Sequence, residues 1–389
     1  MATDDQVRMT RSVPADTHFL RPGLLMPEYL PFPTETQLDL LKAALLPAEQ
    51  AATAWRRWKA RRLQFEALDQ PSGRMLTQVW ANRDAAAISA TDRAVLKRLY
   101  HRTLASNAAK LSGALEIIPL LVDAGIPVLI FKGADLIAIY PERLGLRPIS
   151  DVDVLIPEAD GEHAMALLTG AGCEAKGGHG MGPFGLYHAR PYECPNGSTL
   201  DVHRWAIKTA SDDRVMFETA RETTLLGQPV LIPSATECLV MAIGVAFSGR
   251  GLCAPMRWIA DAMLLFEIEG DAIEWDVLLK RARRPGLSLG LAAGLDFLAR
   301  EFGAPVPADV LTELRRRKVS WRERGAYWMA INDPPRVVGS LLFQLEQHRT
   351  QRLNYAAGVP RDFLGYLAQS PRVRTGKRRD VFKLLESPR

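Results

Sequence analysis

The sequence predicts a mixed α/β (α+β) protein in which a small mixed sheet is flanked by N- and C-terminal α-helical segments. Three observations predict this class. The apolar run at residues 128–131 is typical of a buried strand, and a tight Lys132-Gly133 turn follows it. Residues 151–156 alternate carboxylates with apolar side chains, as a half-buried strand does. On both sides of this region, apolar residues recur at the three- and four-residue steps of amphipathic helices.

The chain divides into four predicted segments. The first is rich in proline and irregular, whereas the second and fourth have helical periodicity and the third carries the strands. Their expected bounds are a proline-rich arm over residues 1–34, an N-terminal helical region over 35–125, the α/β core over 126–232, and a C-terminal helical domain over 233–389.

Within the helical segments, the pattern predicts a first helix that begins at Glu35 and two helices over residues 85–99 and 102–124. The C-terminal segment opens with Ser234-Ala235-Thr236-Glu237, which has the form of a capping box. In such a box the serine and the glutamate each satisfy a free backbone N–H group of the other.

Composition limits the class of protein and its partners. Of the 389 residues, 47% are hydrophobic and 24% are charged, which is ordinary for a globular protein. The net charge of +5 is compatible with anionic substrates but does not require a nucleic acid. Basic clusters at residues 315–318 and 377–379 are typical of solvated helix faces, so nucleic acid is not an expected partner. No apolar run is long enough to predict a membrane span.

The cysteines predict a reducing compartment. Four of them, widely spaced and without a C-x-x-C pair, do not suggest a disulfide framework. The first 13 residues are polar and lack the apolar stretch of a signal peptide. We therefore expect a cytoplasmic protein.

Two carboxylates lie on the second predicted strand. Because side chains alternate along a strand, Asp151 and Asp153 point to one face while Val152 and Val154 point into the protein. Two parallel carboxylates repel each other unless a cation lies between them. Oxygen ligands at this spacing suit Mg²⁺, which takes the rest of its coordination shell from water and substrate phosphates. The glycine turn at Lys132-Gly133 is expected to offer backbone N–H groups to those phosphates.

A third carboxylate is expected on a neighbouring strand. Residues 187–192 and 199–203 predict two antiparallel strands joined by a turn. Asp201 would then lie beside the strand that carries Asp153, if both strands belong to one sheet. Three carboxylates can hold two metal ions, one for the attacking group and one for the leaving pyrophosphate.

This ordered set of motifs resembles the polymerase-β-type nucleotidyltransferase superfamily. The resemblance is carried by Lys132-Gly133, by the segment from Arg147 to Asp153, and by Asp201-Val202-His203. With residues 233–237 and 257–261 added, the pattern is similar to the bacterial nucleotidyltransferase family proteins of that superfamily. The similarity spans roughly residues 35–269.

The resemblance implies a role for each residue of the pattern. Asp151 and Asp153 would bind the metals, and Asp201 would complete the second metal site or act as a base. Gly133 would let the backbone approach the β- and γ-phosphates, and Lys132 and Arg147 would neutralise phosphate charge. The implied cofactor is Mg²⁺, as two ions, with Mn²⁺ as the alternative.

The pattern departs from the superfamily in two places. The usual Gly-Ser after the first strand is Lys132-Gly133-Ala134 here, so no serine hydroxyl is available to a phosphate. The helix after Ser234 has no histidine at residues 245–247, where the family often carries one.

Three other residues have more than one interpretation. His203 lies two residues beyond Asp201 on the same face, and roles beside the metal, as a base or in the core remain open. Arg257 and Asp261, four residues apart, form either an ion pair on a helix surface or a cleft wall that binds nucleotide or acceptor.

The leading hypothesis is an Mg²⁺-dependent enzyme that moves a nucleoside monophosphate from a nucleoside triphosphate to a hydroxyl or phosphate acceptor and releases pyrophosphate. The first alternative is transfer of a sugar from a nucleotide-sugar to a modified peptide or small molecule. The second is a non-catalytic binding or regulatory protein, against which the three carboxylates argue. The expected partners are therefore a nucleoside triphosphate or nucleotide-sugar and a small-molecule, peptide or protein acceptor.

Overall fold

The computed structural model describes most of the chain between residues 30 and 365. The described residues are 30–176, 188–207, 213–248, 256–284 and 286–332, together with 341, 345, 348, 349, 352 and 361–365. Most of the proline-rich arm predicted over residues 1–34 and the basic cluster at 377–379 therefore lie outside the described residues.

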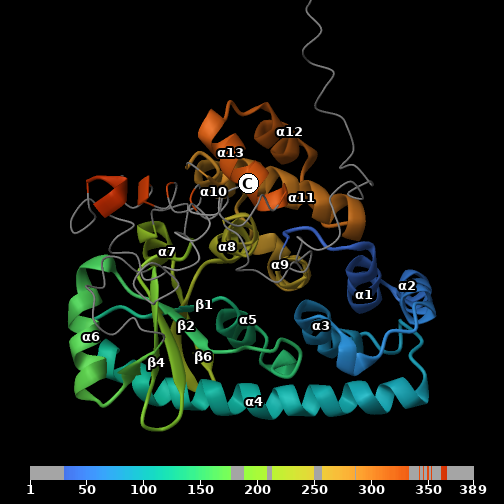
Figure 1. The fold of residues 1–389 in the computed structure, drawn as a ribbon, viewed down its shortest axis with the longest axis horizontal. Coiled ribbons are helices and arrows are strands. Elements are labelled where there is room, and N and C mark those ends of the chain that lie inside the picture. The colour runs from blue at the N-terminus through green and yellow to red at the C-terminus, as the bar shows by residue number, and fades with distance from the viewer. Residues whose placement is uncertain are drawn as a thin grey trace, which may run out of the picture.

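A seven-stranded mixed sheet forms the centre of the protein, as the sequence predicts (Figure 1). The strand order is β3-β4-β5-β2-β1-β7-β6. β1 is antiparallel to β2 and parallel to β7, and β2 is parallel to β5. The strands are β1 (Leu129–Phe131), β2 (Val152–Leu155), β3 (Glu174–Ala175), β4 (Ala189–Glu193), β5 (Thr199–His203), β6 (Arg221–Leu225) and β7 (Gln228–Ile232). β4 and β5 form the predicted antiparallel pair.

Four α-helices precede the sheet in the described part of the chain. They are α1 (Glu35–Leu45), α2 (Ala48–Ala60), α3 (Gln70–Ala81) and α4 (Ala90–Val122). α4, of 33 residues, extends beneath both the sheet and α3 in Figure 1. Two helices inserted in the sheet region, α5 (Ala134–Ile139) and α6 (Gly161–Gly170), cover β1 and β3.

The N-terminal helices differ from the prediction in two respects. The expected pair over residues 85–99 and 102–124 is one helix, because nothing near Arg102 breaks it; Ser89 caps its start by accepting from the Asp92 N–H. α3 was not expected as a separate helix. Its start is set by Asp69, whose carboxylate accepts from the Ser72 N–H, and by the proline that follows in the first turn.

The C-terminal helices lie above the sheet in Figure 1. They are α8 (Ala235–Phe247), α9 (Arg257–Glu269), α10 (Trp275–Arg281), α11 (Ser288–Phe302), α12 (Ala308–Arg316) and α13 (Trp321–Asn332), and the short α7 (Arg214–Glu218) lies between β5 and β6. Half of the predicted capping box forms. Ser234 accepts from the Glu237 N–H, but the Glu237 carboxylate pairs with Arg281, 2.9 Å away, instead of reaching back to Ser234.

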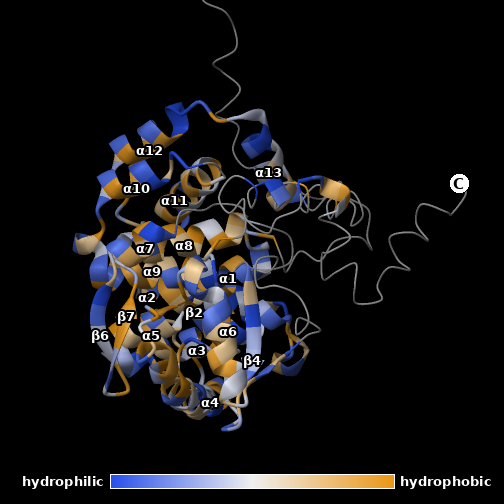
Figure 2. Ribbon diagram, turned by 90° about the vertical axis from the view of Figure 1, so that its left-hand side faces the viewer, coloured by the Kyte–Doolittle hydropathy of each residue, from blue (hydrophilic) through white to orange (hydrophobic). Residues whose placement is uncertain are grey.

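Alternation along the strands separates the two faces of the sheet. Val152 and Val154 of β2 and Val202 of β5 join an apolar cluster with α4 and α6. The residues between them therefore point to the opposite face, where a second cluster contains Phe131 and much of α1, α8, α9 and α11. Figure 2 shows that apolar residues gather where these layers meet. The catalytic carboxylates predicted from the sequence consequently face the C-terminal helices.

One disulfide is present, contrary to the expectation from cysteine spacing. Cys173 and Cys194 are bonded because β3 and β4 pair and bring these flanking residues together, 4.1 Å apart at Cα. Cys238 is free and buried. The structure shows one bond rather than a framework, and the cytoplasmic location stays a prediction. Among the described residues, no helix combines the length and apolar character that crossing a bilayer requires.

Candidate active site

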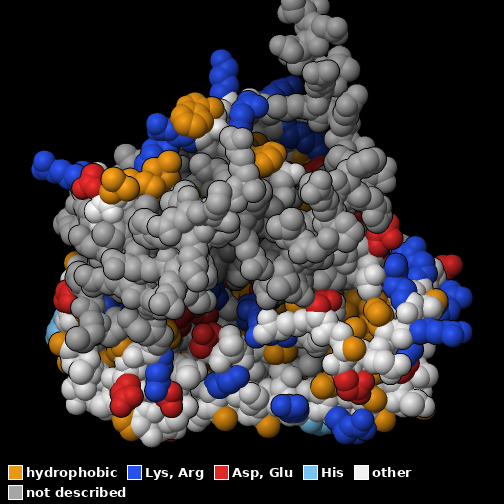
Figure 3. All heavy atoms as spheres, viewed as in Figure 1, with side chains coloured by type: hydrophobic (Ala, Val, Ile, Leu, Met, Phe, Trp, Pro, Cys, Tyr) orange, Lys and Arg blue, Asp and Glu red, His pale blue; other side chains and the backbone are white. Residues whose placement is uncertain are grey.

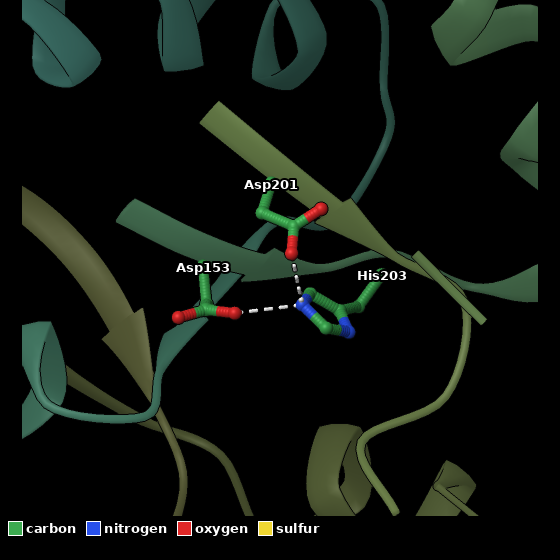
Figure 4. A group of neighbouring side chains, drawn as sticks. All are labelled: Asp153, Asp201 and His203. Carbon is green, nitrogen blue, oxygen red and sulfur yellow. Dashed lines mark hydrogen bonds and ion pairs between the residues drawn. The ribbon is translucent and has the colours of Figure 1, made fainter. Parts of the chain in front are cut away.

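Two neighbouring parallel strands position the central acidic residues. In the register of β2 and β5, Asp153 lies directly opposite Asp201. His203, two residues further along β5, points to the same face (Figure 4). The prediction that Asp201 lies beside the strand of Asp153 is therefore confirmed.

His203 joins the two carboxylates. Its Nε2 lies 2.7 Å from Asp153 Oδ1 and 3.2 Å from Asp201 Oδ2, so both side chains converge on one nitrogen (Figure 4). The imidazole is 1% exposed and packs edge-on against Phe131 and His188, with ring centroids 5.0 and 5.4 Å away. Burial and Lys132 alone would lower the pKa of His203, but the two aspartates raise it overall. The ring is thus fixed in place between the carboxylates.

Lys132 supplies a positive group to this cluster. Its Nζ lies 3.3 Å from Asp153 Oδ1 and 3.1 Å from His203 Nε2. Burial alone would raise the pKa of Asp153, but Lys132 and the hydrogen bond with His203 lower it to about 2. Asp153 is therefore ionised at neutral pH. Lys132 itself has a φ of 54°, a left-handed backbone conformation in the tight turn after β1.

Asp151 lies just outside β2, which begins at Val152. It is half-buried and accepts a hydrogen bond of 2.9 Å from the Ser150 hydroxyl. Burial and the negative charge of Asp153 raise the pKa of Asp151. Asp151 thus adds a third carboxylate near Asp153, as the sequence predicts, from the turn before the strand rather than from within it.

Arg147 and Asp261 form a buried bidentate ion pair. Arg147 Nε and Nη2 lie 2.8 and 2.9 Å from the two carboxylate oxygens of Asp261. Burial alone would lower the pKa of Arg147, but Asp261 raises it. Asp261 therefore pairs across the fold with Arg147 rather than along its own helix with Arg257, and its binding of nucleotide or acceptor stays a prediction.

Gly133 is required by this ion pair. Its φ of 121° suits glycine, and a Cβ added here would collide with the guanidinium of Arg147. Its N–H donates to Asp135 Oδ1, so that group is taken by the protein rather than free for a phosphate. Asp135 is a site residue that the sequence analysis missed. Its signal is a carboxylate two residues after the glycine, in the first turn of α5.

One cavity of about 330 Å³ gathers the predicted residues. It is lined from three parts of the chain: the sheet, helix α3 and the C-terminal helices. All nine candidates line it, namely Lys132, Gly133, Arg147, Asp151, Asp153, Asp201, His203, Arg257 and Asp261. Helices α8 and α9 add an apolar wall that includes Met241, Val245 and Leu265.

The residues of this cavity fit a divalent metal ion. Ligand atoms of Asp153, Asp201 and His203 all lie within 4.8 Å of one another. Asp201 Oδ1 is buried and has no hydrogen-bond partner in the part of the chain that the structure describes. A buried carboxylate oxygen without a partner is costly unless a ligand binds it. Carboxylate oxygens are the donors that Mg²⁺ and Mn²⁺ prefer.

A family model described as "uncharacterised nucleotidyltransferase" matches residues 74–303, more than half of the chain. The chain belongs to this family. The match includes all nine candidate residues and runs from α3 to the end of α11. No curated protein matches the chain.

Two solved structures are similar to part of this member of the nucleotidyltransferase family. The antibiotic-resistance factor ANT(2'')-Ia is 16% identical, with a TM-score of 0.33, over 50% of this chain and 95% of its own. An antigenic nucleotidyltransferase-like protein from Paracoccidioides brasiliensis is 17% identical, with a TM-score of 0.34, over 54% of this chain and 94% of its own. At these scores nothing about substrate follows from either likeness.

Replacing Asp261 by asparagine should destabilise the fold by about 3 kcal/mol, because it leaves the buried Arg147 guanidinium without its charge partner. The free energy of unfolding in urea measures this. The matched control is the double variant Arg147→Met/Asp261→Leu, which removes both charges and should recover most of the loss. A single variant as stable as the native protein would contradict the structural importance of the pair.

Replacing Lys132 by methionine should increase the affinity for Mn²⁺ about tenfold, because it removes a positive charge that lies beside Asp153. Electron paramagnetic resonance of free Mn²⁺ during titration measures the affinity. Lys97→Met, which removes an exposed lysine from α4, is the matched control and should leave it unchanged. An equal or weaker affinity in Lys132→Met would show that Mn²⁺ binds elsewhere.

Proposed function

We propose that this protein is a divalent-metal-dependent nucleotidyltransferase. It moves a nucleoside monophosphate from a nucleoside triphosphate to a hydroxyl or phosphate of an acceptor, with release of pyrophosphate. The proposal rests on one observation: Asp153 and Asp201 are paired in register on adjacent parallel strands, with Asp151 beside them, in a cavity that also contains cationic side chains. Membership of the nucleotidyltransferase family supports it.

Asp151, Asp153 and Asp201 are the residues that would hold Mg²⁺ or Mn²⁺. When bound, the ion would offset negative charge on the phosphates and on the attacking oxygen. Two ions are proposed because three carboxylates are present. His203 acts as a positioning residue, because its Nε2 hydrogen-bonds Asp153 and lies within reach of Asp201, which fixes the orientation of both carboxylates.

In the proposed reaction, the acceptor oxygen forms a bond to the α-phosphorus while the bond from that phosphorus to the bridging oxygen of the pyrophosphate breaks. The proton of an acceptor hydroxyl goes to a carboxylate, and Asp201, whose Oδ1 has no partner among the described residues, takes this role in the alternative in which it does not complete the second metal site. Lys132 and Arg147 offset the charge that develops on the pyrophosphate. Trp258 and the apolar wall from α8 and α9 exclude water.

A small molecule or a peptide fits the cavity better than a nucleic acid. A volume of about 330 Å³ is at the lower end of the range for small-ligand sites. In Figure 3, basic side chains gather over α2 at the right-hand edge of the molecule. Arg57 of α2 and Arg61, which follows it, are both bonded to Asp39, which reduces the net charge that this helix offers to a phosphate backbone.

Replacing Asp153 by asparagine should abolish Mg²⁺-dependent binding of nucleoside triphosphates, because the site loses a carboxylate whose pKa is lowered to about 2. Calorimetric titration with each of the four triphosphates, with and without Mg²⁺, measures the loss, which should exceed tenfold for the preferred nucleotide. Asp123→Asn, an exposed substitution at the end of α4, is the matched control and should bind as the native protein does.

A parallel titration with nucleotide-sugars separates the two transferase hypotheses. Binding of a nucleoside triphosphate that depends on both Mg²⁺ and Asp153 supports nucleotidyl transfer. A native protein that binds a nucleotide-sugar and no triphosphate would overturn this proposal in favour of sugar transfer. Binding of neither ligand would leave a non-catalytic protein as the remaining hypothesis.

A further inference from the structure

Helix α3 brings an arginine into the cavity from the N-terminal helical region. Gln70, Pro71 and Arg74 line the cavity together with the residues of the sheet. The Arg74 side chain is half-buried, and its guanidinium makes no hydrogen bond or ion pair within the described ranges. An arginine that is partly withdrawn from water without a partner is unusual, because its five donors need acceptors.

Arg147 also presents an unused donor here. Its Nε and Nη2 are bonded to Asp261, but Nη1 is buried and has no partner among the residues that the structure describes. Nη1 lies over Gly133, where a Cβ would otherwise be. Arg147 is only 7% exposed, so bulk water does not hydrogen-bond to Nη1.

A third arginine completes the group. Next to the main cavity, a smaller one of about 20 Å³ is lined by Arg74, Arg147 and Arg257, which come from α3, from the segment before β2 and from α9. Asp261 also lines this smaller cavity, where it forms an ion pair with Arg147. Among the residues that line this smaller cavity, one carboxylate thus faces three guanidinium groups, so Arg74 and Arg257 have no carboxylate partner there.

The rest of the electrostatic environment is consistent with an anion site. Burial lowers the pKa of Arg74, and the charge of Arg147 lowers it further, while Asp151 raises it. Like charges held together in a partly buried place favour a bound anion. Since Asp151 is near Arg74, an anion between the arginines would also lie next to the carboxylates that are proposed to hold the metal.

We propose that Arg74, Arg147 Nη1 and Arg257 form a binding site for the diphosphate group of the nucleotide substrate. Guanidinium groups match phosphate oxygens because they donate two parallel hydrogen bonds in one plane. A diphosphate carries enough negative charge to balance the two unpaired cations. The inference rests on the proposed function and extends it, since it makes the N-terminal helical region, through α3, part of the substrate site.

Inorganic pyrophosphate is the probe that tests the site without a nucleoside. In calorimetric titrations with the full chain and Mg²⁺, Arg74→Gln should weaken pyrophosphate binding by roughly tenfold to a hundredfold, because it removes charge-assisted hydrogen bonds. Arg74→Lys keeps the charge but not the planar fork, so its loss should be smaller. Arg98→Gln, on the exposed face of α4, is the matched control and should change the affinity less than twofold.

Thermal unfolding checks that Arg74→Gln folds, which we expect because the native guanidinium has no protein partner to lose in the described residues. Equal pyrophosphate affinities for folded Arg74→Gln and Arg98→Gln would overturn the inference. An Arg74→Gln protein that fails to fold would also overturn it, because the side chain would then be structural.

Repeating the comparison of Arg74→Gln with Arg98→Gln, with a nucleoside triphosphate and with a nucleotide-sugar, shows which of these substrates supplies the diphosphate group. The true substrate is the one whose affinity falls in Arg74→Gln and not in Arg98→Gln. A loss confined to pyrophosphate and the nucleotide-sugar keeps the diphosphate site and overturns nucleotidyl transfer. Mg²⁺-dependent triphosphate binding that is equal in both variants keeps the proposed function and overturns this site.

Discussion

The active-site region depends on the pairing of two like charges. The register of β2 and β5 sets Asp153 directly opposite Asp201, and the strand alternation points both into the same cavity. Such an arrangement is unfavourable unless positive charge is supplied. In the structure Lys132 supplies it at 3.3 Å from Asp153, and His203 Nε2 lies between the two carboxylates, 2.7 and 3.2 Å from them. These same contacts fix the orientation of the two carboxylates.

The site also lies where the N-terminal helices, the sheet and the C-terminal helices contact one another. The Arg147–Asp261 ion pair connects the segment before β2 with α9, and a continuous apolar cluster extends from α1 through the sheet to α11. Gly133 is fixed by this pair, since only a residue without a Cβ leaves room for the guanidinium. Because the ion pair is buried, it fixes the position of α9 against the segment before β2 more than it adds to the net free energy of unfolding.

Much of this arrangement could be predicted from the sequence, because strand alternation is a local property. The period of two at residues 151–156 and the hairpin before His203 predicted two strands that carry Asp153 and Asp201, and the structure adds the parallel pairing of β2 with β5 that sets them side by side. The partner of Asp261 could not be predicted, because a contact between residues 114 positions apart leaves no local signal. The Cys173–Cys194 bond was missed for a similar reason: it follows from the pairing of β3 with β4, not from cysteine spacing. The contribution of α3 was missed because no helix was predicted over residues 70–81.

The central claim is that the carboxylates of β2 and β5 hold a divalent ion that binds the nucleotide phosphates. The most direct test is anomalous diffraction from crystals of the full chain grown with Mn²⁺ and a non-hydrolysable nucleoside triphosphate. The account predicts an anomalous peak within coordination distance of Asp153 and Asp201, with the triphosphate beside it and Lys132 moved away from Asp153. A bound triphosphate with no peak at these carboxylates, and with Lys132 still between Asp153 and His203, would contradict it.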